Sequence, residues 1–240
     1  MVAPAVDAGD FDAAQVEVFA GLIWVNSDPD ATSLRSWLGP LAAQIAAYRI
    51  EEMALESDVT MPLACNWKCS VDVHNEGYHL HTLHPEILGF VDDTAVEITI
   101  YGPHGRMIVP MGRPSARLPG ATVPANAPKI SDNHMFYVFP NVQLNCYDDH
   151  VMLFRHRPHP TDPGMCSFDQ QIFRRGQAAE RLASHRRLER GDSLGPITDA
   201  DLDVVERLQL GMAGRGFDNP IWCGQEKFIA HMHATLETWL

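Results

Sequence analysis

Residues 134–157 read HMFYVFPNVQLNCYDDHVMLFRHR, and this stretch decides the fold class. It contains three short runs rich in β-branched and aromatic residues, separated only by Pro-Asn and by Asp-Asp-His. Runs of this kind bounded by turn-forming residues predict consecutive antiparallel strands. The predicted strands of this block are VEITIY (96–101), RMIVPM (106–111), HMFYVF (134–139), VQLNCY (142–147), VMLFRHR (151–157) and SFDQQIF (167–173).

Helical patterns flank this block. On the C-terminal side we expect helices at about 176–190, 199–213 and 225–239. On the N-terminal side we expect a strand at 16–25 and another near 50–61. Between these two strands we expect a helix from a Ser33 cap to Tyr48, which Gly39-Pro40 bends or splits. Strands grouped together with helices at the ends predict an α+β domain with an antiparallel sheet. The Pro-, Ala- and Gly-rich segment 113–130 is long for a loop inside a domain, which favours a lid or an entrance.

Composition excludes several classes of function. The chain has 240 residues, 45% hydrophobic, and carries 31 acidic against 18 basic side chains, for a net charge of -13. A surface this acidic argues against a nucleic-acid or anionic-membrane partner. Neither a secretory signal at the start nor an apolar run of the roughly 18 residues that a membrane span needs is found. No GxGxxG, P-loop or GxSxG motif occurs.

Five cysteines without a CxxC pair argue against a disulfide framework or a zinc ribbon. They predict buried or half-buried thiols and a cytoplasmic location.

Chemistry concentrates in residues 66–85, NWKCSVDVHNEGYHLHTLHP, which hold four histidines and two carboxylates. On a helix, Asp72, Glu76 and His79 would share a face. His79 and His84 are five apart, about 140° around a helix, so the helix must break for both to reach one metal ion. Neutral imidazole is the commonest metal ligand, but a surface role or a hydrogen-bonded core role for each histidine stays open.

A third, anionic ligand would have to come from elsewhere in the chain. On the predicted helix 199–213, Asp201 shares an apolar stripe with Val205, whereas Asp203 lies on the opposite face. An acid in an apolar stripe is costly to bury unless it is paired or bound to a metal. Thr198 as N-cap offers an alternative, because Asp201 would then complete a capping box at its own helix start.

These residues resemble a known family. NWK, followed after six residues by Asn-Glu-Gly-Tyr-His and five further residues ending in His-Pro, is similar to the iron-binding signature of Rieske-type non-haem iron oxygenase alpha subunits, which hydroxylate aromatic rings or demethylate. GLIWVNSDP, YVFPNVQL and DLDVVERLQLGM resemble further segments of the catalytic domain, so the similarity spans nearly all 240 residues. It implies one catalytic domain, residues 1–240, with a helix-grip (START or Bet v 1-like) fold: a curved antiparallel sheet and a long helix around an apolar pocket.

The resemblance also assigns roles to individual residues. His79, His84 and Asp201 would bind Fe(II), and Glu76 would be the bridging carboxylate through which electrons arrive. Asp72 and Tyr78 would contact these ligands without binding the metal themselves. Many members have Glu-Asn where this chain has Asp72-Val73. Candidate pocket residues on the predicted strands and the last helix are Tyr101, Met107, Phe136, Val138, Leu144, Phe154 and Phe228.

One element of the family pattern is missing. A Rieske [2Fe-2S] centre takes two Cys and two His, and no cysteine of this chain has a histidine two or three positions on. The resemblance therefore implies an electron donor of the Rieske or ferredoxin type in another domain or chain, a small, aromatic substrate with O2, and a homotrimer. Two alternatives stay open: a redox-inactive ligand-binding domain on the same scaffold, and a zinc hydrolase with Glu76 as general base.

Overall fold

The computed structural model describes residues 14–127, 131–176 and 184–239. The chain divides into two compact units, Met1–Glu52 and Met53–Leu240, and all the candidate site residues belong to the second. No helix in the described ranges is both long and apolar enough to cross a bilayer.

The first unit begins with a β-hairpin where the sequence predicts one strand. β1 (Gln15–Phe19) and β2 (Leu22–Asn26) pair antiparallel through a two-residue turn at Ala20 and Gly21. Both turn residues have positive φ, 52° and 74°, the conformation of the tight hairpin turns that match strand twist. The single-strand prediction for 16–25 is wrong because Ala-Gly carries only a weak turn signature.

The predicted helix after Ser33 is confirmed, and it is split. Ser33 caps α1 (Leu34–Leu38), and its hydroxyl accepts a hydrogen bond from the Ser36 amide. Gly39, with φ of 54°, then turns the chain before Pro40 opens α2 (Pro40–Ala46). A 3-10 turn, η2 (Ile50–Glu52), occupies the start of the predicted strand 50–61.

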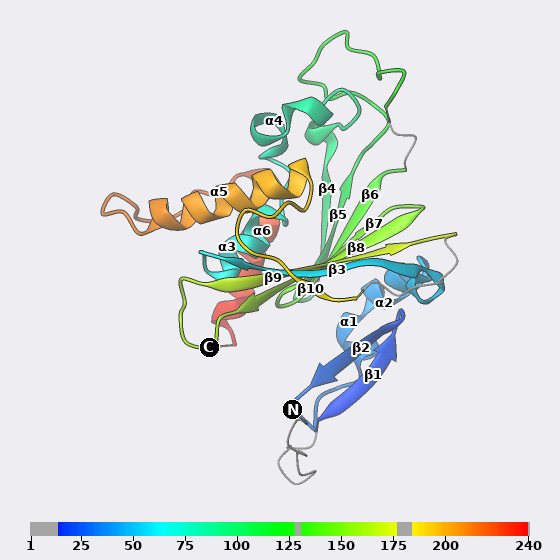
Figure 1. Ribbon diagram of the computed structural model, residues 1–240, viewed down its shortest axis with the longest axis vertical. Coiled ribbons are helices and arrows are strands. Elements are labelled where there is room, and N and C mark those ends of the chain that lie inside the picture. Colours follow the sequence, from blue (N-terminus) through cyan, green and yellow to red (C-terminus); the bar gives the residue numbers. More distant parts are fainter. Residues whose placement is uncertain (1–13, 128–130, 177–183, 240) are drawn as a thin grey trace. The chain divides into compact units, whose positions relative to one another are not determined.

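The second unit is built on an eight-stranded sheet with the order β10-β3-β9-β8-β7-β6-β5-β4 (Figure 1). Every neighbouring pair is antiparallel except β10 with β3, so the expected antiparallel sheet with flanking helices is confirmed. Its strands are β3 (Ala54–Leu63), β4 (Glu97–Tyr101), β5 (His104–Val109), β6 (Asn133–Val138), β7 (Val142–Cys146), β8 (His150–Pro158), β9 (Cys166–Arg174) and β10 (Arg186–Arg187).

The predicted helix 176–190 is not formed where the chain is described. Residues 186–187 form β10 instead and pair in parallel with β3. Residues 177–183 of that prediction lie outside the described residues.

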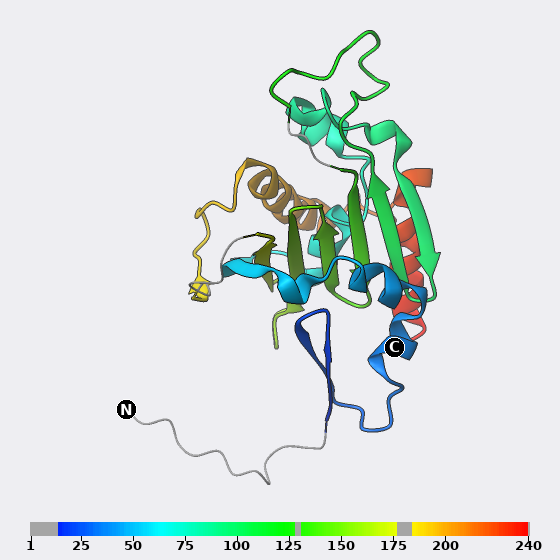
Figure 2. The same ribbon diagram turned by 90° about the vertical axis from the view of Figure 1, so that its right-hand side faces the viewer.

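The helices of this unit are short except for two. They are α3 (Trp67–Val73), α4 (Leu80–Leu83), α5 (Pro196–Met212) and α6 (Lys227–Glu237), with 3-10 turns η3 (Pro85–Ile87), η4 (Asp93–Ala95) and η5 (Gly224–Glu226). α6 lies beside β4 and β5 (Figure 2), where the Phe228 ring covers Gly105 and packs edge-on against Tyr137. Gly105 is required there, because a Cβ on it would lie 2.2 Å from the ring.

α5 is held against the start of α3 by two side chains that cap backbone amides. Glu206 accepts a hydrogen bond from the Ala64 amide at 2.7 Å, and Gln209 accepts one from the Asn66 amide at 2.9 Å. Below these contacts, Val205 of α5 joins a buried cluster with Leu63 of β3 and Phe168 of β9. The apolar packing and the two caps together fix α5 relative to the end of β3 and the start of α3.

A buried carboxylate ties three strands together on the sheet. Asp169 of β9 is 3% exposed and accepts hydrogen bonds from Thr60 of β3 and from Arg155 and Arg157 of β8, at 2.6 to 2.7 Å. Burial opposes its charged form, but these bonds outweigh it and lower the pKa of Asp169. Asp169 is therefore ionised, and it contributes stability at neutral pH.

Candidate metal centre

The segment that carries the histidines is broken where the sequence requires it. α3 ends at Val73, and α4 is a single turn with His79 at its N-cap and His84 directly after it. His84 leaves the helical conformation, with φ of -124° and ψ of 51°, before Pro85 opens the next turn. Asp72 and Glu76 therefore do not share a helix face, and that expectation is corrected because α3 stops between them.

Asp201 lies in the second turn of α5, one helix turn before the buried Val205. The helix begins at Pro196 with Gly195 as N-cap, so the Thr198 cap is wrong, and Asp199 instead accepts a hydrogen bond from the Leu194 amide at 2.7 Å. The capping-box interpretation of Asp201 fails for the same reason.

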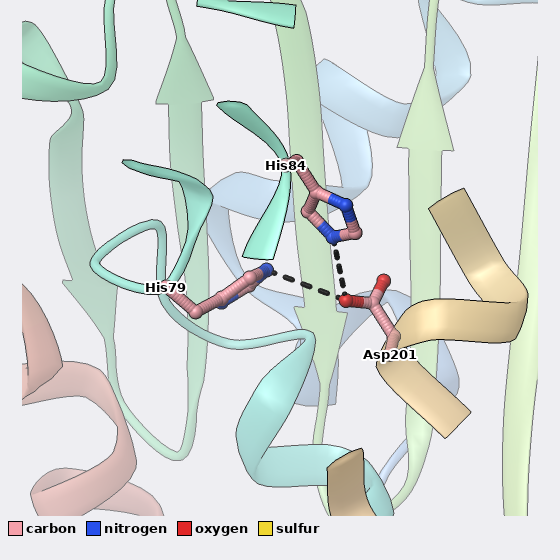
Figure 3. Close-up of side chains that lie close together, drawn as sticks. All are labelled: His79, His84 and Asp201. Carbon is pink, nitrogen blue, oxygen red and sulfur yellow. Dashed lines mark hydrogen bonds and ion pairs between the residues drawn. The ribbon is translucent and has the colours of Figure 1, made fainter. Parts of the chain in front are cut away.

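His79, His84 and Asp201 meet although 117 residues separate the last two (Figure 3). His84 Nε2 lies 2.8 Å from Asp201 Oδ1, and His79 Nε2 lies 3.5 Å from the same oxygen. One ligand atom from each residue falls within a common span of 4.8 Å. His84 and Asp201 are buried, whereas Asp203 is exposed and pairs with Arg207.

Glu76 positions the imidazole of His79. One of its carboxylate oxygens hydrogen-bonds His79 Nδ1, and the other accepts from the backbone amides of Tyr78 and His79, the latter at 3.1 Å. Because the carboxylate only accepts, Nδ1 carries the proton and Nε2 faces the other two residues with its lone pair. Burial opposes protonation of His79, but the bond to Glu76, the charge of Glu76 and that of Asp201 together raise its pKa.

The donor set fits a divalent transition metal. Two imidazole nitrogens and one carboxylate oxygen on one side of a cation form the 2-His-1-carboxylate arrangement typical of non-haem Fe(II) sites. A carboxylate on the remote nitrogen of one imidazole is the usual support of such a ligand, and Glu76 supplies it.

A cavity of about 150 Å³ adjoins these three side chains. Its walls come from the α3–α4 segment, the start of α5 and the facing sides of β5 to β8. Apart from His79, His84, Asp201 and Glu76, the lining residues are Val73, His74, Leu80, Ile87, Val91, Met107, Val109, Met111, Asn133, Met135, Asn145, Tyr147, Met152, Phe154, Ile197 and Thr198.

The comparison with protein families decides the relationship. Residues 50–240 match the family described as the ring hydroxylating alpha subunit (catalytic domain). The chain belongs to this family. The expectation of a Rieske-type oxygenase relationship is thereby confirmed.

Curated relatives agree with this family. The carnitine monooxygenase oxygenase subunit of Escherichia coli (strain K12) is 27% identical over 217 residues, which is 87% of this chain and 55% of the relative. The subunit of the same name from Acinetobacter pittii is 24% identical over 207 residues, 85% of this chain and 53% of the relative. The chain thus spans about half the length of the curated relatives it matches.

Solved structures agree on the fold. The quaternary ammonium Rieske monooxygenase CntA in complex with an inhibitor superposes with a TM-score of 0.72 at 17% identity, over 94% of this chain and 61% of that chain. Apo dicamba monooxygenase superposes with a TM-score of 0.55 at 14% identity, over 94% and 68%. The mixed architecture with an antiparallel sheet is therefore that of Rieske oxygenase catalytic domains.

Of the seven expected pocket residues, Met107 and Phe154 line the cavity. Phe136 and Leu144 are paired neighbours on β6 and β7. Each is one residue away from a lining residue of its own strand, Met135 or Asn145, and successive side chains of a strand point to opposite faces of the sheet. Both therefore point to the other face. Tyr101, Val138 and Phe228 also lie outside the lining, the last because it packs between Gly105 and Tyr137.

The side chains of the two expected supporting residues contact other partners than the three candidate ligands. Both carboxylate oxygens of Asp72 lie 3.0 Å from His233 Nε2 on α6, and burial raises the pKa of Asp72. The side chain of Tyr78 is exposed and its ring contacts His81, while its backbone amide contacts Glu76.

Sequence reasoning missed a buried polar network behind the cavity wall. The Ser70 hydroxyl lies 2.7 Å from His156 Nδ1, and His156 Nε2 lies 2.8 Å from Gln143 Oε1, so Nε2 donates and Nδ1 accepts. Gln143 in turn donates to Asn75, the residue before Glu76. Burial, aided by His74, lowers the pKa of His156 well below its usual value, which keeps the ring neutral.

His74, whose ring contacts His156 of this network, lines the cavity. Its Nδ1 donates to the Ser70 carbonyl at 2.8 Å, and its Nε2 is buried without a partner among the described residues. Burial lowers the pKa of His74, so this Nε2 is a neutral acceptor. The sequence shows a histidine five residues before His79, but it does not indicate that the side chain of this histidine faces the cavity.

Proposed function

We propose that this chain is the mononuclear-iron catalytic domain of a Rieske-type oxygenase. In this proposal His79, His84 and Asp201 hold Fe(II), and residues 1–240 form one catalytic domain of the helix-grip type around an apolar pocket. The observation that carries it is the convergence of the three side chains at a cavity in a chain of this family. Bound Fe(II) would supply the activation of O2 beside the cavity.

The protein's own groups have distinct tasks in this reaction. Glu76 keeps the proton on His79 Nδ1 and so holds Nε2 as a ligand atom. Asp201 supplies the one anionic ligand, from a helix that Glu206 and Gln209 fix to the backbone near α3. Apolar side chains from β5, β6 and β8 exclude water and orient a small organic substrate, which we expect to be aromatic, for monooxygenation.

Electrons would arrive through Glu76 from a Rieske [2Fe-2S] cluster held by another domain or chain, of the Rieske or ferredoxin type. The sequence has no cysteine followed two or three residues later by histidine, which supports a donor outside these 240 residues. A homotrimer, the usual assembly of the family, is part of the same proposal.

The hydrolase alternative is disfavoured by the state of Glu76. A general base needs a carboxylate that is directed at the attacking water. Both Glu76 oxygens are already hydrogen-bonded, one to His79 and the other to two backbone amides. This carboxylate is arranged to orient a ligand rather than to abstract a proton.

The test is anaerobic Fe(II) reconstitution followed by metal analysis and turnover with a Rieske-type reductase system. We expect one iron per chain, an EPR signal of a high-spin ferrous nitrosyl after addition of nitric oxide, and O2 consumption that requires the donor. Hydrolysis with zinc and no reductant would support the hydrolase instead. Ligand binding with no metal retained would support the redox-inactive domain.

A matched pair of variants tests the route of electrons. Glu76→Gln should keep iron, because the amide oxygen can still accept from His79 Nδ1, but should lose donor-dependent turnover. Asp72→Asn, at the carboxylate that pairs with His233, should keep most turnover. Unchanged turnover in Glu76→Gln would contradict the role of Glu76.

A further inference from the structure

The cavity beside the candidate metal centre carries no fixed positive charge. Among the described residues that line it, none is lysine or arginine, and two, Glu76 and Asp201, are acids. A divalent cation bound at the site would balance these two acids and leave the cavity close to neutral. An anionic group entering here would lose its hydration without gaining a lysine or arginine partner, and two acids already balance the charge of the cation.

The polar groups on the sheet side of the cavity are amides. Asn145 of β7 is 3% exposed and Asn133 of β6 is 7% exposed, and both line the cavity. The Asn145 Nδ2 donor and the Asn133 Oδ1 acceptor are buried without a partner among the described residues. Asn133 also hydrogen-bonds Tyr147, which makes its amide nitrogen the donor to the phenol and leaves Oδ1 without a hydrogen-bond partner in the described part of the chain.

The two amides are neighbours across adjacent strands. Asn145 pairs directly with Met135, so Asn133, two residues earlier on the same face, is its diagonal neighbour. Diagonal neighbours on one face are near enough for a single small group to contact both side chains. One donor and one acceptor at this separation match a group that both accepts and donates a hydrogen bond.

The remaining wall is apolar and adaptable. Met107, Met111, Met135 and Met152 all line the cavity, together with the Phe154 ring. Unbranched thioether side chains fit irregular apolar shapes and contact aromatic rings favourably. A cavity of about 150 Å³ has the size at which a protein interior accommodates a benzene ring.

We propose that this site selects an uncharged, ring-sized substrate that carries a group able both to accept and to donate a hydrogen bond, such as a primary amide, with Asn145 donating to it and Asn133 accepting from it. This inference rests on the proposed function and narrows its substrate class. It separates this chain from its relatives: the structure of CntA with L-carnitine holds a molecule that bears a carboxylate and a quaternary ammonium. Among the described lining residues there is neither a lysine or arginine for that carboxylate nor, with only Tyr147 and Phe154 as aromatic side chains, an aromatic cage for that ammonium.

Three probes of one shape test the charge selection: benzamide (uncharged), benzoate (anionic) and benzylammonium (cationic). Binding to the full chain is measured by calorimetry, once after metal removal by a chelator and once after reloading with Fe(II) under nitrogen. For the Fe(II)-loaded protein we expect benzamide to bind in the millimolar range or tighter, and the two charged probes and L-carnitine at least about tenfold more weakly. In the metal-free protein benzylammonium alone should gain, because Glu76 and Asp201 are then not balanced by a cation. Equal or tighter binding of any charged probe to the Fe(II)-loaded protein, or no measurable binding of benzamide to it, would overturn the inference.

Substitutions at Asn145 test the residue assignment. Asn145→Leu keeps the number and branching of the side-chain heavy atoms and removes the donor, so benzamide should lose about five- to tenfold in affinity while toluene still binds. Asn145→Asp replaces the donor by a charged acceptor and should reverse the preference toward benzylammonium, which keeps the test decisive if the leucine variant does not fold. Benzamide affinity unchanged in both variants would refute the role of Asn145.

The outcomes separate the two proposals. A chain that retains iron and turns over with a donor but prefers benzoate contradicts only the substrate class. A chain that prefers benzamide but retains no iron contradicts the oxygenase function and leaves the binding site standing.

Discussion

Exchanging Asp201 for asparagine should separate the metal site from the fold, because this side chain serves both. Without metal, Asp201 Oδ1 accepts from His84 Nε2 at 2.8 Å, and an asparagine oxygen can accept the same bond. The free energy of unfolding of the metal-free protein should therefore change by no more than about 1 kcal/mol. The charge is what the exchange removes.

The effect on metal binding should be much larger. Changes to residues that only support metal ligands cost about 10- to 100-fold in affinity, and Asp201 is the one anionic member of the proposed ligand set. We therefore expect Asp201→Asn to weaken Fe(II) binding by more than about 100-fold, which corresponds to about 2.8 kcal/mol or more.

The matched control is two residues away on the same helix. Asp203 is exposed and pairs only with Arg207, an i,i+4 contact worth a few tenths of a kcal/mol, so Asp203→Asn should leave iron affinity unchanged. Anaerobic Fe(II) titration against a competing chelator gives the affinities, and thermal unfolding in chelator gives the stability of each metal-free variant. An Asp201→Asn protein that binds Fe(II) within about threefold of the parent would refute the assignment.

Three further outcomes test the fold. Gly105→Ala should destabilise the protein by about 1 to 3 kcal/mol in denaturant titrations, because the new Cβ would meet the Phe228 ring at 2.2 Å. Asp169→Asn should cost about 1 to 3 kcal/mol at neutral pH, because the bonds to Arg157 and its neighbours lose their charge. Since the pKa of Asp169 is lowered by folding, that difference should be full above about pH 5 and should shrink as pH falls through the folded-state pKa, as unfolding measured at several pH values would show. Alkylation by iodoacetamide should modify half-buried Cys223 first and the four buried cysteines only on unfolding, so early modification of another thiol in a mass spectrum would contradict this burial.

The sheet was predictable because its strands are separated by short, polar turns. Residues 134–157 form β6, β7 and most of β8 as expected, since each run alternates or is continuously apolar over a strand length. The hairpin at 15–26 was missed because Ala20-Gly21 interrupts an apolar run without a polar residue. In the same way, the two residues of β10 are too few to carry any periodicity.

The candidate ligands were assigned through the family resemblance, and residue chemistry alone made them candidates without deciding their roles. An acid at position 201 in an apolar stripe and two histidines around a short helix are each unusual, and the structure brings them within 4.8 Å. The supporting role expected of Asp72 came from the resemblance alone, and its carboxylate contacts His233 on α6, a partner that no sequence pattern indicated.

The cavity wall shows where sequence reasoning must stop. Side chains alternate between the two faces of a strand, so the choice of Phe136 and Leu144 rather than Met135 and Asn145 differs by a single residue of register. Both faces of β6 and β7 are largely buried, which removes the polar-apolar alternation that normally identifies the inner face. The residues that would set substrate choice are therefore those that periodicity cannot assign, and only the pairing of Met107 with Met135, and of Met135 with Asn145, puts the amides and the methionines on the side of the metal centre.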